Sequence, residues 1–161
     1  MRDRFIVSCA LKVVMVLLFT CSAWAQAPAS KATPKRLAAS PDKVAIQVND
    51  NDPKVMNLAL NNAKNVVDYY KGKGQKVTVE IVTYGPGLHM LRGDTSPVKQ
   101  RVAEMSLAMP ELSFAACANT QANMAKQEAK DISLLSEARV VPSGVVRLIE
   151  LQRKGYAYIR P

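Results

Sequence analysis

The chain has 161 residues, enough for one ordinary domain with a hydrophobic core, and a formal net charge of +9. Its basic side chains are spread along the sequence, and no aromatic residues interleave with them to form a stacking platform. We therefore expect a solvated basic surface and no nucleic-acid partner.

The first 25 residues have the pattern of a secretory signal peptide. Its parts are two arginines at the start, an apolar core and an A-x-A cleavage site: Arg2, Arg4, residues 13–19 and residues 23–25. The apolar run is shorter than the roughly 20 residues that span a bilayer, so we expect no stable membrane insertion after cleavage near Ala25. The mature protein is then periplasmic or secreted. A retained membrane anchor, or lipid processing at Cys21, is the alternative.

Export leaves the chain with one cysteine. Cys9 and Cys21 lie in the signal peptide, so Cys117 is the only thiol that the mature chain keeps, and an internal disulfide is excluded. Residues 26–42 repeat proline, alanine and serine and contain almost nothing large and apolar to bury, which predicts a disordered linker. The folded domain then spans residues 43–161.

Strand and helix patterns alternate along this domain. An apolar strand over residues 44–48 is followed by Asp52, which can cap a helix, and by Pro53, which suits the first helical turn. Apolar residues then recur at helical spacing as far as Gly72. Residues 77–81 alternate between apolar and polar side chains, which predicts a strand at the edge of the sheet with one wetter face.

The second half of the domain continues the alternation. We expect a short helix near residues 88–91, a helix after Ser96-Pro97, a strand that ends at Cys117, a helix over 119–129, a strand over 139–141, a helix capped by Ser143 and a last strand over 156–159. Residues 131–138 are open between a short helix and a loop. Five short strands that alternate with helices predict an α/β fold of three layers, α/β/α, with a five-stranded, mainly parallel sheet.

Three loops should meet at the carboxyl ends of the strands, where open parallel sheets bind ligands. They cover residues 49–52, 85–89 and 117–120. Cys117 lies between an apolar run and a helix-starting stretch, and the N–H groups of a helix amino terminus favour thiolate over thiol. A thiolate is the nucleophile in sulfur transfer and disulfide exchange. The alternative is a buried cysteine that only packs.

The other residues of these loops support fewer kinds of chemistry. His89 is the only histidine and falls at the same end of the sheet, where it could activate the thiol, although a surface or packing role is the alternative. One cysteine and one histidine are too few for a zinc site, so we expect no metal and no cofactor. The turn with Gly85 and Gly87 permits close backbone approach but lacks the spacing of a phosphate-binding loop.

Four segments of the domain carry a resemblance to a known family. They are Gly85–Leu88, Cys117–Thr120, Val140–Val145 and Leu151–Pro161. Together and in this order they resemble the DsrE/DsrF-like family of small sulfur-relay proteins, in particular its single-domain members. The resemblance extends across nearly the whole domain.

This resemblance implies the three-layer α/β/α fold and assembly into homo-oligomers, either trimers or hexamers. It also implies that Cys117 carries a persulfide and passes the sulfur to a partner protein or a small thiol. The residues expected to take part are Cys117, Asn119 and His89 for catalysis and Ala118, Thr120, Gly85 and Gly87 for anion binding. The alternative is a non-catalytic oligomeric module that binds a small ligand or a protein, in which Cys117 is structural.

Overall fold

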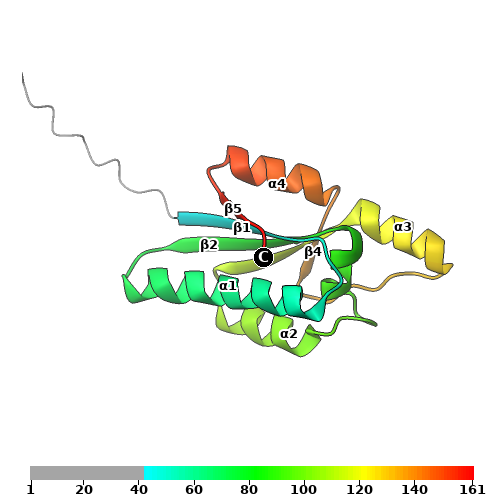
Figure 1. Ribbon diagram of the computed structural model, residues 1–161, viewed down its shortest axis with the longest axis horizontal. Helices are drawn as coiled ribbons and strands as arrows, with labels where there is room; N and C mark the ends of the chain where they lie inside the picture. Colours follow the sequence, from blue (N-terminus) through cyan, green and yellow to red (C-terminus); the bar gives the residue numbers. More distant parts are fainter. Residues whose placement is uncertain (1–41) are drawn as a thin grey trace, which may run out of the picture. The chain divides into compact units, whose positions relative to one another are not determined.

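The structure is a computed structural model that describes residues 42–161. The elements follow in the order β1 (Asp42–Val48), α1 (Pro53–Gly72), β2 (Val77–Thr83), the 3-10 helix η1 (Gly85–Leu91), α2 (Lys99–Ala108), β3 (Leu112–Cys117), α3 (Ala118–Glu128), β4 (Ala138–Val141), α4 (Gly144–Arg153) and β5 (Ala157–Ile159). This α/β alternation confirms the predicted fold class (Figure 1). The predicted signal peptide, and the predicted linker except for its last residue, lie outside the described residues.

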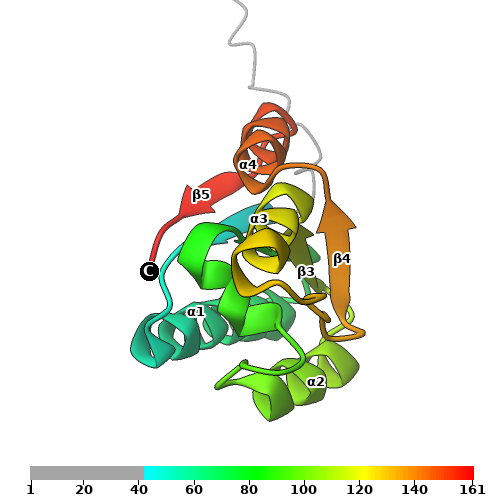
Figure 2. The same ribbon diagram turned by 90° about the vertical axis from the view of Figure 1, so that its right-hand side faces the viewer.

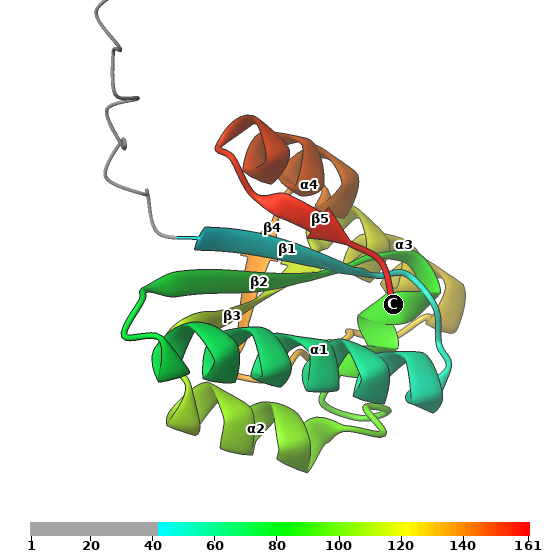
Figure 3. The same cartoon turned by 60° about the vertical axis from the view of Figure 1, so that its left-hand side comes forward.

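The five strands form one sheet in the order β4-β3-β2-β1-β5, and every pair of neighbours is parallel (Figure 3). The register pairs Val48 of β1 with Thr83 of β2, and Thr83 in turn with Ala116 of β3. The segments that follow β1, β2 and β3 therefore all leave the sheet at the carboxyl end of the strands. This parallel register places the three predicted loops side by side.

Strand β2 lies at the centre of the sheet, so the prediction that residues 77–81 form an edge strand was wrong. The side chain that suggested a wet face is Glu80, and it is only 4% exposed. Arg147 of α4 donates one 2.7 Å hydrogen bond to each carboxylate oxygen of Glu80, and Arg139 of β4 donates another at 3.1 Å. The charge is tolerated in the middle of the sheet because two guanidinium groups neutralise it and satisfy its lone pairs.

Helices cover the two faces of the sheet unequally. Helices α1 and α2 lie on one face and α4 on the other, while α3 lies beside η1 at the carboxyl end of the strands (Figures 1 and 2). The main core lies under α1, α2 and η1 and includes the buried side chains of Ile46, Leu60, Ile81, Leu88 and Phe114. Helix α3 buries none of its residues fully, so its polar surface remains open at this end of the sheet.

The helix ends are set by the local signals that the sequence contains. Asp52 accepts a 2.8 Å hydrogen bond from the N–H of Lys54, and Pro53 is the first residue of α1. Ser143 caps α4 in the same way.

Residues 131–137 form an irregular connection with a single bridge from Leu134, so this segment is a loop and not a short helix. Within residues 42–161, no helix is long and apolar enough to cross a bilayer.

Candidate functional site

The three loops converge because the turn after β2 packs directly on the end of β1. Gly85 adopts the left-handed backbone conformation, with φ of 53°, which glycine adopts without strain. A Cβ atom on Gly87 would lie 2.3 Å from the carbonyl oxygen of Val48, so a larger residue does not fit there. The N–H of Gly85 donates a 2.9 Å hydrogen bond to Oγ1 of Thr120, which ties this turn to the first turn of α3.

Cys117 is both the last residue of β3 and the N-cap of α3. Its Sγ accepts a hydrogen bond from the N–H of Thr120 at 3.4 Å. The backbone N–H of Gly144, the first residue of α4, also acts on this sulfur and lowers the pKa of the thiol. The thiol therefore lies between the amino termini of two helices, and its residue is buried, with 4% exposed.

Two opposing effects act on the pKa of the Cys117 thiol. Burial is the largest single effect and raises the pKa because it disfavours the thiolate. The Thr120 side chain and the backbone N–H groups of Gly144, Thr120 and Asn119 donate hydrogen bonds to the sulfur, and together they lower the pKa below its ordinary value. The partial positive charges at the amino termini of α3 and α4 act in the same direction. This environment stabilises a thiolate out of contact with bulk water.

The other predicted residues of the Cys117–Thr120 segment differ in their contribution. Thr120 contacts both the thiol and the Gly85 turn, so it joins two of the three loops. Asn119 is exposed, and its N–H also donates to the carbonyl oxygen of Pro142 at 3.3 Å. Ala118 is the first residue of α3 and makes the turn between strand and helix. In this segment it is the backbone, more than the side chains, that surrounds the sulfur.

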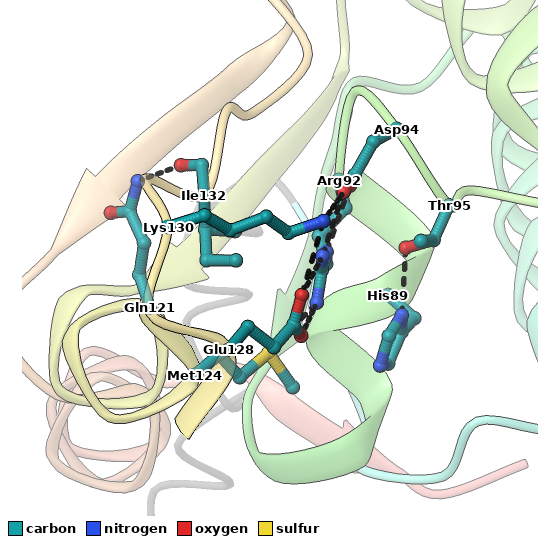
Figure 4. Close-up of polar contacts among 9 residues, drawn as sticks. All are labelled: His89, Arg92, Asp94, Thr95, Gln121, Met124, Glu128, Lys130 and Ile132. Atoms are coloured by element: carbon teal, nitrogen blue, oxygen red, sulfur yellow. Dashed lines mark hydrogen bonds and ion pairs between the residues drawn. The ribbon is translucent and has the colours of Figure 1, made fainter. Parts of the chain in front are cut away.

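His89 lies on η1, at the predicted end of the sheet, but its ring has a different partner. Its Nδ1 lies 2.7 Å from Oγ1 of Thr95. Figure 4 shows the two side chains in contact. Within residues 42–161, no hydrogen bond joins His89 to Cys117. The proposed Cys–His pair is therefore not formed in this arrangement.

The sequence patterns did not assign Gly144, which acts on the thiol, or Tyr84, which packs on Gly144. Tyr84 follows β2 and packs on Gly144 so closely that a Cβ atom there would lie 2.8 Å from the Cβ of Tyr84. Burial raises the pKa of the Tyr84 phenol. A helix start directly after a strand, Ser143-Gly144, was the signal that could have identified Gly144. No pattern in the sequence identified Tyr84.

A groove of about 380 Å³ opens between η1 and α3, next to the thiol. Residues from all three loops contribute to its lining, among them Asn51, Pro86, His89, Thr120, Asn123 and Gln127. Thr120 connects the groove to the thiol. It lines the groove and donates a hydrogen bond to Sγ of Cys117. The groove is therefore one side chain away from Cys117.

A buried arginine links the segment after η1 to the end of α3 (Figure 4). The Arg92 side chain, just after η1, is 1% exposed and donates hydrogen bonds to the carboxylates of Asp94, at 2.8 and 2.9 Å, and Glu128, at 2.5 and 2.9 Å. Lys130 completes the cluster with an ion pair to Asp94 at 2.9 Å. Arg92 is the main cause that lowers the pKa of Glu128 to about 2 and also lowers that of Asp94. Because Glu128 is the last residue of α3, this cluster holds α3 against η1.

Within the described part of the chain, no group of three His, Cys, Asp or Glu side chains is placed to hold a metal ion. The fold and the site together define an α/β protein with a parallel sheet. Its buried thiol lies at the carboxyl end of the strands, between the amino termini of two helices.

No protein-family model matches the chain, and neither does any curated protein. Among solved structures, the chain is similar to a protein of unknown function, MTH1491, from Methanobacterium thermoautotrophicum. The two are 30% identical, the match covers 74% of this chain and 99% of that one, and the TM-score is 0.62. The chain therefore belongs to the same family as MTH1491.

Proposed function

We propose that the protein is an exported sulfur carrier of the DsrE/DsrF-like type, in which the Cys117 thiol accepts a single sulfur atom and hands it on. The observation that carries this function is the position of Sγ between the amino termini of α3 and α4. A cysteine that only packs in a core gains nothing from groups that stabilise its thiolate. At Cys117 such groups outweigh a burial that acts the other way.

The transfer begins when the Cys117 thiolate attacks the terminal sulfur of a donor persulfide, R–S–SH. A new S–S bond forms to Sγ as the S–S bond of the donor breaks, and the donor leaves as the thiolate R–S⁻ with the bonding electron pair. The proton stays on the transferred sulfur, so Cys117 then carries –S–SH. An acceptor thiolate takes the outer sulfur by the same reaction in reverse. With Cys117 as the one thiol of the mature chain, the acceptor is a partner protein or a small thiol.

Assembly with further copies of the chain is part of the same proposal. Strand β4 forms one edge of the sheet, and apolar side chains are exposed on it and on α4: Val140, Val145, Val146 and Ile149. A group of exposed apolar side chains beside an open strand edge is typical of an interface between proteins. Val146→Lys should therefore lower the molar mass found by sedimentation equilibrium.

A second candidate function is a non-catalytic binding module in which Cys117 is structural. Two observations favour it, the 4% exposure of Cys117 and the engagement of His89 with Thr95. In that case the groove between η1 and α3 would hold a ligand without any reaction at the thiol.

Exposure of the full chain to polysulfide, followed by mass analysis of its peptides, decides between the two. The sulfur-carrier function predicts that the peptide with Cys117 gains one sulfur atom, and that Cys117→Ser abolishes this gain. Cys9→Ser and Cys21→Ser are the matched controls and should leave it intact. A native protein whose Cys117 neither gains sulfur nor reacts with a small alkylating reagent would instead be a binding module.

A further inference from the structure

The lining of the groove between η1 and α3 combines polar side chains with apolar ones such as Pro86 and Met124. None of its lining residues is Asp, Glu, Lys or Arg. Three carboxamides contribute to it, from Asn51 in the loop after β1 and from Asn123 and Gln127 on α3. Within residues 42–161, these three side chains make no hydrogen bond to the protein, in contrast to Gln121 on the same helix, which donates to the carbonyl oxygen of Ile132 at 2.7 Å. The carboxamides of the groove are therefore free to pair with a ligand.

The arrangement of these groups favours an uncharged ligand that contains amides. An anion is ordinarily bound by Arg or Lys, and a cation by carboxylates. The buried charge of Arg92, just after η1, is already neutralised by Asp94 and Glu128. Asn123 and Gln127 are four residues apart, so they lie on one face of α3, with their Cβ atoms about 5–6 Å apart. Each can exchange a pair of hydrogen bonds with an amide of the ligand.

The groove also has an end that leads to the thiol. Thr120 lines it, accepts the hydrogen bond of Gly85 through Oγ1 and donates to Sγ of Cys117 through its N–H. Thr120 is therefore the residue that joins the groove to the sulfur. The volume of about 380 Å³ is within the range of small-molecule sites, roughly 300–1,000 Å³.

We propose that this groove binds an uncharged, amide-bearing thiol in its persulfide form, with the sulfur end at Thr120 and the amides along Asn123 and Gln127. This assignment rests on the proposed function, since it names the class of donor from which Cys117 takes sulfur. The groove holds the carrier part of the donor, and the donor leaves as its thiolate once Cys117 has taken the outer sulfur.

The test separates binding from sulfur transfer by means of a donor analogue that cannot react. S-methylpantetheine is uncharged, contains two amides and has a methyl group in place of the reactive hydrogen or sulfur. Its binding to the full chain with Cys117→Ser is measured by calorimetry or ligand-observed NMR. Asn123→Leu and Gln127→Leu, combined in the same chain, should weaken the affinity about tenfold or more, because each removes the hydrogen bonds of a carboxamide to the ligand.

Two controls make the result specific. Gln100→Leu removes an exposed carboxamide on α2, away from the groove, and should leave the affinity unchanged. S-methylglutathione, which carries amides of the same kind but also charged groups, should bind at least about tenfold more weakly, since the groove offers no charged partner. All the substituted carboxamides are exposed, and a circular dichroism spectrum identical to that of the parent chain shows that the variants fold.

The assignment is overturned if S-methylpantetheine does not bind at millimolar concentration, if the leucine variants bind it as well as the parent does, or if S-methylglutathione binds equally well. These outcomes are distinct from a failure of the proposed function. Binding that depends on Asn123 and Gln127, together with no uptake of sulfur by Cys117 from polysulfide, would leave a ligand site without sulfur transfer. Uptake of sulfur without such binding would leave a sulfur carrier whose donor binds elsewhere.

Discussion

Arg147→Met removes the main partner of the carboxylate in the middle of the sheet. Glu80 is 4% exposed and keeps two 2.7 Å hydrogen bonds to Arg147, whereas Arg139 offers one at 3.1 Å from a side chain that is itself 56% exposed. Breaking a buried ion pair from one side costs about 3–5 kcal/mol, because the remaining charge is left in a medium of low polarity. Since Arg139 stays, we expect the lower end of this range. Such a loss is a large part of the roughly 5–15 kcal/mol that stabilises a domain.

Urea unfolding followed by circular dichroism measures this loss as a lower transition midpoint with an unchanged slope. Lys64→Met is the matched control, because it breaks an exposed pair with Asp68 and should cost less than about 1 kcal/mol. The double variant Glu80→Leu with Arg147→Met should recover most of the stability, since it replaces both charges by apolar groups. An Arg147→Met variant whose stability is within about 1 kcal/mol of the parent, or a double variant less stable than the single one, would contradict this role of Arg147.

Three further predictions concern the site and its supports. Gly87→Ala should destabilise the domain by about 1–3 kcal/mol in thermal unfolding, because its Cβ would clash with the backbone of β1, whereas Gly72→Ala has open space and should be neutral or slightly stabilising. Thr120→Val removes a side-chain donor to the thiolate, so the pKa of Cys117 should rise and its alkylation should require a higher pH; an unshifted pH profile would contradict this. Arg92 depresses the pKa of Glu128 from 4.5 to about 2, so the stabilisation is complete above pH 4.5 and is lost as the pH falls towards 2. The melting temperatures of the parent and Glu128→Gln should therefore differ above pH 4.5 and converge near pH 2, and a constant difference would argue against this cause.

The convergence of the loops could be predicted because it depends on local patterns and one topological rule. Asp52 and Ser143 mark helix starts, the apolar runs mark strands, and parallel strands that alternate with helices have their carboxyl ends at one edge. These signals placed Cys117 and Thr120 together with the Gly85 turn. This topological rule specifies that the loops meet at the carboxyl end of the strands, but it gives no distances between side chains. It therefore could not decide whether His89 reaches the thiol. In the structure the ring of His89 pairs with Thr95 instead.

The order of the elements, the approximate limits of the helices and the position of Cys117 between a strand and a helix could be predicted, because these depend on residues close together in the chain. Three other features depend on partners 27 to 67 residues away in the chain. They are the central position of β2 with its buried Glu80, the amino terminus of α4 beside the sulfur, and the ion pair between Arg92 and Glu128. Glu80 shows the reason most clearly. A charged residue in a strand indicates a solvent-exposed position unless its partners are known. The partners of Glu80 are Arg139 and Arg147, and they approach it only when the sheet has formed.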